Sequence, residues 1–530
     1  MKAITNRKGG KLNRQYVKYL VASICFSLVF IVLLLIGNVI FDCDTMPSLA
    51  TIKSYRKAFY SSPVLFAGIV ALLFFLLVFL DKHTVGSRRL IPDALRKSFV
   101  PAVLLMVCYG IVFISYYPGT WCYDMIQQNR MIAGVEELTG HHPLLHTYLW
   151  GLCRWIEGIT GGFAKGIAVY SILQIIAFSF ALGRVVVCAD KVLRNDFVTV
   201  LTLFFFLLNP TFALFSFSPT KDVWCTVFFV LALSFICEGK RIPYVVITLL
   251  LACMFRNNMI YALVPVAVIL FITVAGDRKR IVITSVSVLA GLMLTNAFFF
   301  GVLGIPKSDA KEMLSVPIQQ IGRAYSEHGD SFTAEERELV DRYIGLDIVG
   351  KYNPRISDPL KTTFNNDGFK RDKAGFIRLW AGLGVKYPGT YVTAYLSQYS
   401  PYWYVRAKSY EPYTSSPYVE DFIFEDPYYS FERAGLLDPV YNLFHRIAQG
   451  SSFILFSRGL PFWICLTALF MSILLKRKTG TAIALVCLFY MLTLFLGPIC
   501  LARYTLPVLA AAPLMALSVI KRNHNGTEDT

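Results

Sequence analysis

About twelve long apolar runs, separated by short polar segments, dominate this chain of 530 residues. A helix needs about 20 apolar residues to cross the hydrocarbon core of a bilayer, and most of these runs approach that length. Because 55% of its residues are hydrophobic, a soluble fold of this size could not cover its apolar surface. The sequence therefore predicts an all-α polytopic membrane protein with about 12 transmembrane helices, in a range of about 11–13. The expected spans are residues 19–41, 62–80, 99–117, 164–187, 197–217, 222–238, 243–255, 259–275, 281–303, 453–475, 481–499 and 502–520.

Lys and Arg gather in the short segments that alternate with these spans. Under strict alternation, every basic cluster between spans falls on one side of the membrane, which the positive-inside rule identifies as the cytoplasm. The basic N-terminal segment from Lys2 to Lys18 and the tail from Lys521 then also lie in the cytoplasm, in a multi-pass protein of the plasma membrane. The first run is long and no A-x-A site follows it, so we expect an uncleaved anchor. The predicted cytoplasmic segments between spans are 81–98, 188–196, 239–242, 276–280 and 476–478.

The run from 243 to 275 has two interpretations, because Arg256-Asn257-Asn258 interrupt it. As a single span, it would turn every later basic cluster toward the outside. The positive-inside rule therefore favours two short helices that meet at an external polar turn.

This arrangement divides the chain into four parts. The N-terminal transmembrane module, residues 1–303, is expected to be catalytic and includes the first external loop at 118–163. Residues 304–452, the only sizeable hydrophilic part, are expected to form an extracytoplasmic and partly helical region. Residues 453–520 contain the C-terminal transmembrane helices, and 521–530 form a cytoplasmic tail.

Three stretches of the hydrophilic region have recognisable patterns. Residues 331–336 have the chemistry of a capping box and predict the start of an amphipathic helix. Residues 376–398 are moderately apolar but contain Pro388 and two cations, so we expect one helix that lies at the membrane interface. Residues 399–429 are dense in Tyr, Trp and Pro; their rings either stack on sugars and headgroups or form an aromatic belt with local packing.

The first external loop carries the most unusual combination of polar residues. Asp124 lies among aromatic residues shortly after an apolar run, and His141-His142-Pro143 follow. Asp124 is expected to act as a catalytic base; alternatively, it caps a short helix after the Pro-Gly turn. His141 and His142 are expected to bind a donor phosphate or to orient the base, and because adjacent side chains point in different directions we expect one of them to do so. The alternative for both is a turn before the next helix.

A second group of polar residues precedes the span at 222–238. Ser218-Pro219 have the chemistry of an N-cap and a first helical residue, and they predict a helix from residue 220 onward. Its free amides, together with Lys221, are expected to form an anion site. Asp222 is expected to be a second catalytic acid; alternatively, it complements the helix dipole.

Two arginines complete the predicted outer face. Arg256 lies at the external turn, where it is expected to bind phosphate; the alternative is a side chain that extends to the membrane interface. Arg503 lies near the outer end of the last span beside Tyr504, and its permanent charge and fork of N–H donors are typical of phosphate sites. Both Arg503 and Tyr504 are expected to contact substrate.

The loop from Pro118 to Gln128, PGTWCYDMIQQ, followed by His141-His142-Pro143, resembles the PGTWxYDxxxQ…HHP pattern of a bacterial group within the GT-C class of membrane glycosyltransferases. Protein O-mannosyltransferases and lipid A aminoarabinose transferases belong to this class. The resemblance covers most of the chain in layout; beyond the loop, it includes Lys221-Asp222 and Arg503-Tyr504 more loosely. It implies a GT-C-like fold, substrate binding by Gln128, and transfer of a sugar from a polyprenyl-phosphate carrier to a glycan, protein or lipid acceptor outside the cytoplasm.

No cofactor is expected. Several members of the class have two tandem acids in this loop, and some bind a divalent metal there. This loop has the single acid Asp124, with Glu136 and Glu137 further along the chain. The resemblance therefore does not lead us to expect a metal here. The chain has no G-x-x-x-x-G-K-[ST] motif, as expected for a donor that arrives through the membrane. The net charge of +17 follows from membrane orientation, so membrane lipids, and not nucleic acid, are the expected contacts.

The residue set also fits the chemistry of glycosyl transfer. A glycosyl phosphate already has a good leaving group, so transfer needs one base and cationic or amide donors, and direct displacement inverts the anomeric centre. Two alternatives stay open: a cell-envelope glycan polymerase or ligase, and a secondary transporter or flippase of lipid-linked glycans. A transporter is expected to carry ionisable groups at mid-span, whereas the polar residues here gather on one face, which favours an enzyme.

Overall fold

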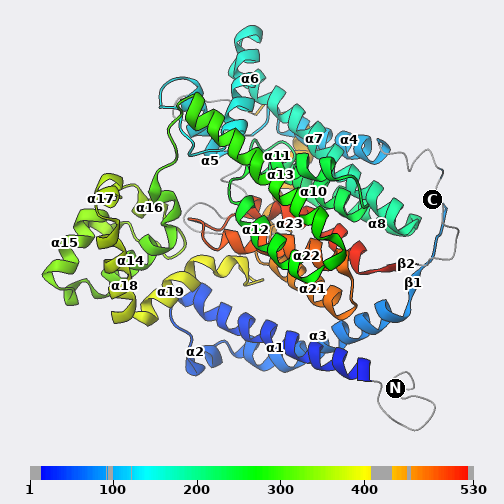
Figure 1. The fold of residues 1–530 in the computed structure, drawn as a ribbon, viewed down its shortest axis with the longest axis horizontal. Helices are drawn as coiled ribbons and strands as arrows, with labels where there is room; N and C mark the ends of the chain where they lie inside the picture. Colours follow the sequence, from blue (N-terminus) through cyan, green and yellow to red (C-terminus); the bar gives the residue numbers. More distant parts are fainter. Residues whose placement is uncertain are drawn as a thin grey trace.

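The computed structural model describes residues 14–90, 92, 99–120, 122–407, 433–450 and 455–522. Within them the chain is almost entirely helical, and its strands are the two-residue segments β1 (Thr84–Val85) and β2 (Lys521–Arg522), which pair in parallel. Figure 1 shows a large bundle of helices with a smaller helical region beside it. The predicted all-α fold is therefore confirmed.

The bundle and its first loop contain α1 (Arg14–Cys43), α2 (Leu49–Ser54), α3 (Arg56–Lys82), α4 (Val100–Ser115), α5 (Tyr123–Ile132), α6 (Leu144–Thr160), α7 (Phe163–Leu193), α8 (Asp196–Leu208), α9 (Pro210–Phe215), α10 (Lys221–Cys237), α11 (Ile242–Phe255), α12 (Met259–Thr273), α13 (Arg278–Asn296), α20 (Asp438–Gly450), α21 (Leu460–Leu474), α22 (Lys478–Leu494) and α23 (Ala502–Val519). The smaller region contains α14 (Ser315–His328), α15 (Ala334–Tyr343), α16 (Asp358–Lys361), α17 (Asn366–Arg371), α18 (Lys373–Lys386) and α19 (Pro388–Tyr399). Short 3-10 or π turns are η2 (Ala275–Asp277), η3 (Ala297–Val302), η4 (Ala310–Met313), η5 (Gly329–Ser331), η6 (Leu346–Gly350) and η7 (Ser400–Tyr402).

Among the described residues, five helical segments are long and apolar enough to cross a membrane: α1, α3, most of α7, α13 with its extension to Val302, and α23. Shorter apolar helices of 10–17 residues accompany them, namely α4, α8, α11, α12, α21 and α22. The chain is therefore an all-α membrane protein. The prediction of a single helix over 197–217 was wrong, because the run is divided into α8 and α9. Pro210 cannot continue the hydrogen bonds of α8, and the Asn209 side chain accepts from the Thr211 amide at 3.0 Å to begin α9.

The ambiguous run 243–275 consists of two helices. α11 ends at Phe255 and α12 begins at Met259, with the polar residues Arg256, Asn257 and Asn258 between them. The extended backbone of Arg256 (φ −150°, ψ 102°) ends α11. This confirms two short helices, as the distribution of basic residues favoured.

Helix α10 lies at the centre of the bundle, where it packs against α7, α11 and α23. Its residues Phe229 and Val230 are fully buried. Small residues allow the neighbouring helices to approach closely; a Cβ atom on Gly183 of α7 would lie only 2.7 Å from the backbone nitrogen of Ala102 in α4. Because α10 is held on several sides, its first residue, Lys221, has a defined position at one end of the bundle.

The smaller region has its own apolar core, which includes Ile321, Tyr343 and Phe376. α15 begins with the predicted capping box: the Thr333 hydroxyl accepts from the Glu336 amide at 3.1 Å, and the Glu336 carboxylate accepts from the Thr333 amide at 2.7 Å. The prediction of one interfacial helix over 376–398 was wrong. The chain forms α18 and α19 there, because Pro388 disfavours a helical conformation at the preceding residue.

Two arginines, the buried Arg323 and the half-buried Arg355, attach the smaller region to the end of α1. Arg323 of α14 donates from Nη1 to the Asp44 carboxylate at 2.7 Å and from Nη2 to the Asp44 carbonyl oxygen at 2.7 Å. Arg355 donates to the carbonyl oxygens of Ile40, at 3.2 Å, and Phe41. These contacts satisfy carbonyl groups at the C-terminal end of α1, which have no partner within the helix.

The smaller region also holds the loop between α22 and α23. The Gln398 side-chain amide donates to the Pro498 carbonyl oxygen at 2.9 Å, and the Tyr399 hydroxyl donates to the Gly497 carbonyl oxygen at 2.7 Å. This loop leads directly into the first turn of α23, which contains Arg503. The smaller region therefore helps to position Arg503.

Part of the aromatic stretch 399–429 packs inside the protein. Trp403 and Tyr404 are buried, and they pack with residues of α1 such as Leu34. For these two rings the structure supports local packing. Tyr410, Tyr413, Tyr418, Tyr428 and Tyr429 lie outside the described residues, as do most of the basic N-terminal segment and most of the C-terminal tail.

We expect Arg323→Ala to lower the free energy of unfolding by about 2 kcal/mol, because the substitution removes a buried guanidinium and its hydrogen bonds to the carboxylate and the carbonyl oxygen of Asp44. Thermal and denaturant unfolding of the purified protein in detergent measures the loss. Arg342→Ala is the matched control, since Arg342 pairs with Glu338 in solvent and should contribute at most about 1 kcal/mol. Equal losses in the two variants would contradict the attachment described above.

Candidate functional site

A cavity of about 840 Å³ lies where the bundle meets the smaller region. Its walls come from the first external loop, the first residue of α10, residues 306–312 and 356–362 of the smaller region, and residues 498–504 around the start of α23. The walls are rich in charged side chains of both signs. A polar cavity of this size can hold a small polar molecule.

Asp124 lies in the first turn of α5, after the turn at Pro118-Gly119. The N-cap of α5 is Cys122, and no side chain accepts a capping hydrogen bond there. The Asp124 carboxylate instead lies 3.0 Å from Lys221 Nζ and 3.3 Å from Arg503 Nη2, both measured to Oδ2. The capping interpretation is therefore wrong, although the short helix itself was predicted.

The two cations set the protonation state of Asp124. Burial by itself would raise the pKa of this carboxyl group, but Arg503 and Lys221 outweigh burial and hold its pKa well below the usual range. Asp124 is thus ionised at neutral pH and lines the cavity. A carboxylate in this state is a weak base for as long as both cations stay paired with it.

Asp222 occupies a different position from Asp124. It is fully buried beneath the cavity, where it pairs with Arg256 and, at 3.4 Å, with Nε of Arg503. The hydroxyl of Thr220 donates to its Oδ2 at 2.9 Å. Asp222 therefore positions the Arg503 guanidinium and is not part of the cavity wall.

The N-cap of α10 lies two residues later than predicted. Thr220, and not Ser218, is its N-cap, and the Thr220 hydroxyl accepts from the Asp222 amide at 3.1 Å. A helical segment beginning at Lys221 places that side chain at the cavity. Thr220 has the same capping chemistry as Ser218, and the sequence alone did not distinguish between the two.

Arg256 and Tyr504 support the pairing around Arg503. The guanidinium of Arg256 lies over the Tyr504 ring, 4.3 Å from its centroid, and Nε of Arg256 donates to Asn258 at 2.9 Å. Arg256 is 9% exposed and does not line the cavity, whereas Tyr504 does. The turn between α11 and α12 thus contributes a cation to the ion pairs with Asp222, and the Arg256 side chain is buried within the protein.

The two adjacent histidines make different contacts. His142 is buried; its Nδ1 lies 3.2 Å from Lys221 Nζ, and its Nε2 lies 2.9 Å from the Gln127 side-chain oxygen. Burial and the Lys221 charge hold the pKa of His142 well below its usual value, so the ring is neutral. An ammonium group only donates, so Nδ1 accepts from Lys221 and Nε2–H donates to Gln127. His142 therefore orients Lys221.

His141 faces the smaller region instead. Its Nδ1 lies 3.8 Å from the Glu312 carboxylate, which also pairs with Lys361 at 3.0 Å. Lys361 is 4% exposed and lies 3.3 Å from Asp358. The sequence offered no signal for these three residues, because only the docking of the smaller region brings them to the cavity.

Gln128, expected to bind substrate, is buried away from the cavity, and its neighbour Gln127 lines the cavity in its place. The Gln128 side-chain oxygen lies 2.8 Å from Nδ1 of His146, whose Nε2 lies 2.7 Å from the Tyr170 hydroxyl. Trp224 donates to the same hydroxyl at 2.9 Å. Burial and Lys221 lower the pKa of His146 to about 3, so this buried network contains a neutral imidazole.

The described residues contain no group of three or more His, Cys, Asp and Glu side chains with the geometry to hold a metal ion. At the wall formed by the bundle, the Asp124 carboxylate contacts the two cations Lys221 and Arg503, and Lys221 contacts the neutral imidazole of His142.

Comparison with families of known sequence gives one finding. A family model described as a family of unknown function (DUF6020) matches residues 133–530, which include both histidines, Lys221, Asp222 and Arg503. The match begins after Asp124. Searches of curated proteins and of solved structures find no match.

We expect the protein to become less stable as the pH falls below about 6.5. His146 and His142 have lowered pKa values when folded, so only the unfolded chain takes up their protons between pH 6.5 and the folded values. Each can reduce the unfolding free energy by up to about 1.4 kcal/mol per pH unit in that window. Unfolding of wild type and His146→Gln from pH 7.5 to 5 measures this slope, which should be smaller in the variant. Parallel slopes would contradict the burial of a neutral His146.

Proposed function

The chain belongs to DUF6020, a family of unknown function, and we propose that it is a membrane glycosyltransferase. It transfers a sugar from a polyprenyl-phosphate-linked donor to an acceptor glycan, protein or lipid outside the cytoplasm. The observation that carries this proposal is a single ionised carboxylate, Asp124, in contact with Lys221 and Arg503 at the wall of a polar cavity. One base beside a pair of phosphate-binding cations is what displacement at a glycosyl phosphate requires.

The two cations have complementary properties for a phosphate group. Arg503 is permanently charged, and its planar guanidinium can donate to two oxygens at once, while Lys221 adds a point charge oriented by His142. As the leaving phosphate gains negative charge in the transition state, both cations stabilise it more strongly. Asp222 and Arg256 position Arg503 from below and do not touch the reacting atoms.

The reaction is one displacement. The acceptor hydroxyl oxygen attacks the anomeric carbon while the bond from that carbon to the phosphate oxygen breaks, and the anomeric centre inverts. The acceptor proton passes to Asp124, and polyprenyl phosphate leaves with the bonding electrons, held by Lys221 and Arg503. His141, Glu312 and Lys361 also line the cavity, and they contact the acceptor.

Donor binding also activates the base. In the resting protein Lys221 and Arg503 hold the pKa of Asp124 low, so its affinity for a proton is weak. A phosphodiester that shares both cations brings negative charge close to Asp124 and raises its pKa. The base therefore becomes effective only when the donor is present.

This function requires the cavity to face the outside of the plasma membrane. The basic segments at 239–242, 276–280 and 476–478 lie at the opposite ends of α10–α13 and α22 from the cavity, in agreement with that orientation. With both termini in the cytoplasm, the twelve-span arrangement predicted from the apolar runs puts the first external loop and the smaller region on the outer side.

We expect Asp124→Asn to lower kcat by about 10²–10⁴-fold, the contribution of a general base. The test compares envelope glycans of a strain lacking the gene after complementation with wild type, Asp124→Asn or Glu157→Gln at equal expression. Glu157 is the matched control, because its carboxylate pairs with Arg154 at 2.8 Å outside the cavity. Full restoration of the glycans by Asp124→Asn would refute the assignment of the base.

We expect the acid limb of kcat to lie at higher pH than the acid limb of kcat/KM. The kcat/KM profile reports the free enzyme, in which the pKa of Asp124 is lowered, whereas kcat reports the donor complex, in which bound phosphate raises it. Initial rates with a short-chain polyprenyl-phosphate hexose between pH 3.5 and 8 should show the acid limb of kcat, while kcat/KM shows no limb from Asp124 over the same range. Coincident limbs would show that the donor does not share the cations of Asp124.

A further inference from the structure

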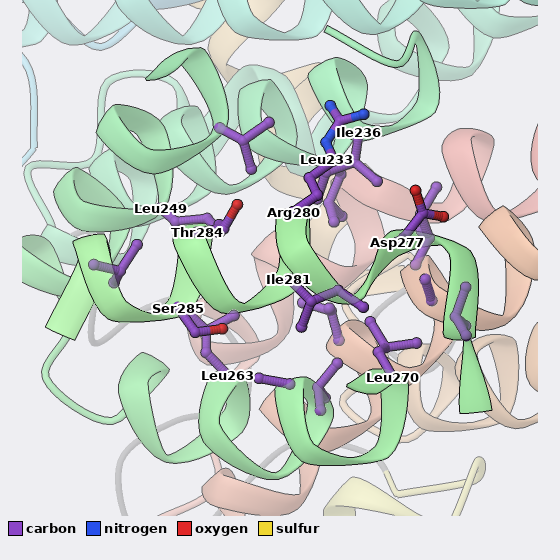
Figure 2. Close-up of a pocket in the computed structure, with 18 of the residues that line it drawn as sticks. Leu233, Ile236, Leu249, Leu263, Leu270, Asp277, Arg280, Ile281, Thr284 and Ser285 are labelled. Carbon is purple, nitrogen blue, oxygen red and sulfur yellow. The ribbon is translucent and has the colours of Figure 1, made fainter. Parts of the chain in front are cut away.

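A second cavity, of about 540 Å³, lies between α10, α11, α12, α13 and α22. Aliphatic side chains make up most of its lining, and Figure 2 shows Leu233, Leu249, Leu263 and Ile281 among the side chains that line it. Its volume is in the range of about 300–1,000 Å³ that is usual for ligand sites. No residue of this lining takes part in the glycosyl transfer proposed above.

The second cavity lies at the other end of the helices that form the candidate site. α10 begins at the site with Lys221, and Ile236 and Cys237 in its last turn line the second cavity. α22 runs in the opposite direction, because its first residue, Lys478, lines the second cavity and Pro498 beyond its end lines the site. At about 1.5 Å per residue, the length of α10 separates the two cavities by about 25 Å.

Two cations, Arg280 and Lys478, are among the residues that line this cavity. Arg280 lies in the first turn of α13, and Lys478 is the first residue of α22. Asp277 is the single carboxylate among the described lining residues, so the two cations outnumber it. A neighbouring hollow extends the basic surface with Lys240, Arg241 and Lys279.

Helix α13 is the least buried of the five long apolar helices in the described part of the chain. Only 6% of the apolar window of α13 is buried within the protein, compared with 67% for α7 and for α23. Inside a bilayer, helices are held together by close packing, since the lipid tails are as apolar as the side chains. An aliphatic chain in the cavity would extend the packing surface between α13 and the bundle.

We propose that the second cavity binds one anionic glycerophospholipid of the membrane. An acyl chain fills the aliphatic space, and the phosphate binds to Arg280 and Lys478 through charge-assisted hydrogen bonds. The net positive charge at this end selects an anionic headgroup over a zwitterionic one, as basic pockets between membrane helices do elsewhere. This lipid site is independent of the proposed transferase activity.

The test uses the full-length protein, purified in detergent and stripped of lipid. Equal amounts of phosphatidylglycerol and phosphatidylcholine with the same acyl chains are added, and native mass spectrometry measures the bound lipid. We expect one phosphatidylglycerol to be retained about tenfold over phosphatidylcholine. The double variant Arg280→Gln, Lys478→Gln should bring this ratio close to one, because it removes the phosphate partners and leaves the aliphatic space intact.

Ala482→Trp adds a side chain to the cavity wall and should reduce the retention of both lipids. Ala267→Leu, a smaller change to the same wall, serves if the Trp variant does not fold. Lys18→Gln is the control, since it removes an exposed cation of α1 outside the cavity and should leave the ratio unchanged. The proposal is overturned if wild type retains the two lipids equally or if the ratio is unchanged in the double variant. It is also overturned if the protein binds no lipid and forms a dimer, in which a second copy would cover the cavity.

Discussion

The candidate site depends on the ion pairs that Arg503 makes with two carboxylates. Arg503 is 2% exposed, and its guanidinium contacts Asp124 at 3.3 Å and Asp222 at 3.4 Å. It thereby joins the first external loop, the start of α10 and the start of α23 in one set of ion pairs. A buried charge is stable only where opposite charges and hydrogen bonds compensate its lost hydration. The positions of both carboxylates therefore depend on Arg503, and the cavity wall is defined by the same contacts.

The smaller region completes the site in two ways. It binds the end of α1 through Arg323 and the α22–α23 loop through Gln398, so it fixes the backbone from which Arg503 extends. It also brings Lys361 and Glu312 to the cavity that Asp124 lines. The cavity has charged walls on both sides because two parts of the chain meet there, and neither part alone encloses it.

The bundle differs in chemistry at its two ends. At one end, ion pairs between acids and cations surround a polar cavity; at the other, an aliphatic cavity ends at Arg280 and Lys478. The orientation proposed for the protein, with the basic second end in the cytoplasm, rests on the positive-inside rule. The proposed transferase site and the proposed lipid site thus lie at opposite ends of the same helices. Helix α10 spans the distance between them.

The sequence by itself determined the features that depend on local physics. Apolar runs of sufficient length predict membrane helices, the break at 256–258 predicts two helices, and the Thr333 capping box predicts the start of α15. Only the tertiary structure decided that Gln127, and not Gln128, faces the cavity and that Lys361 lies there. Consecutive helical residues point about 100° apart, and which of them faces a site depends on how the helices pack. Contacts between distant segments leave no pattern in a single sequence, because they arise only when the smaller region docks on the bundle.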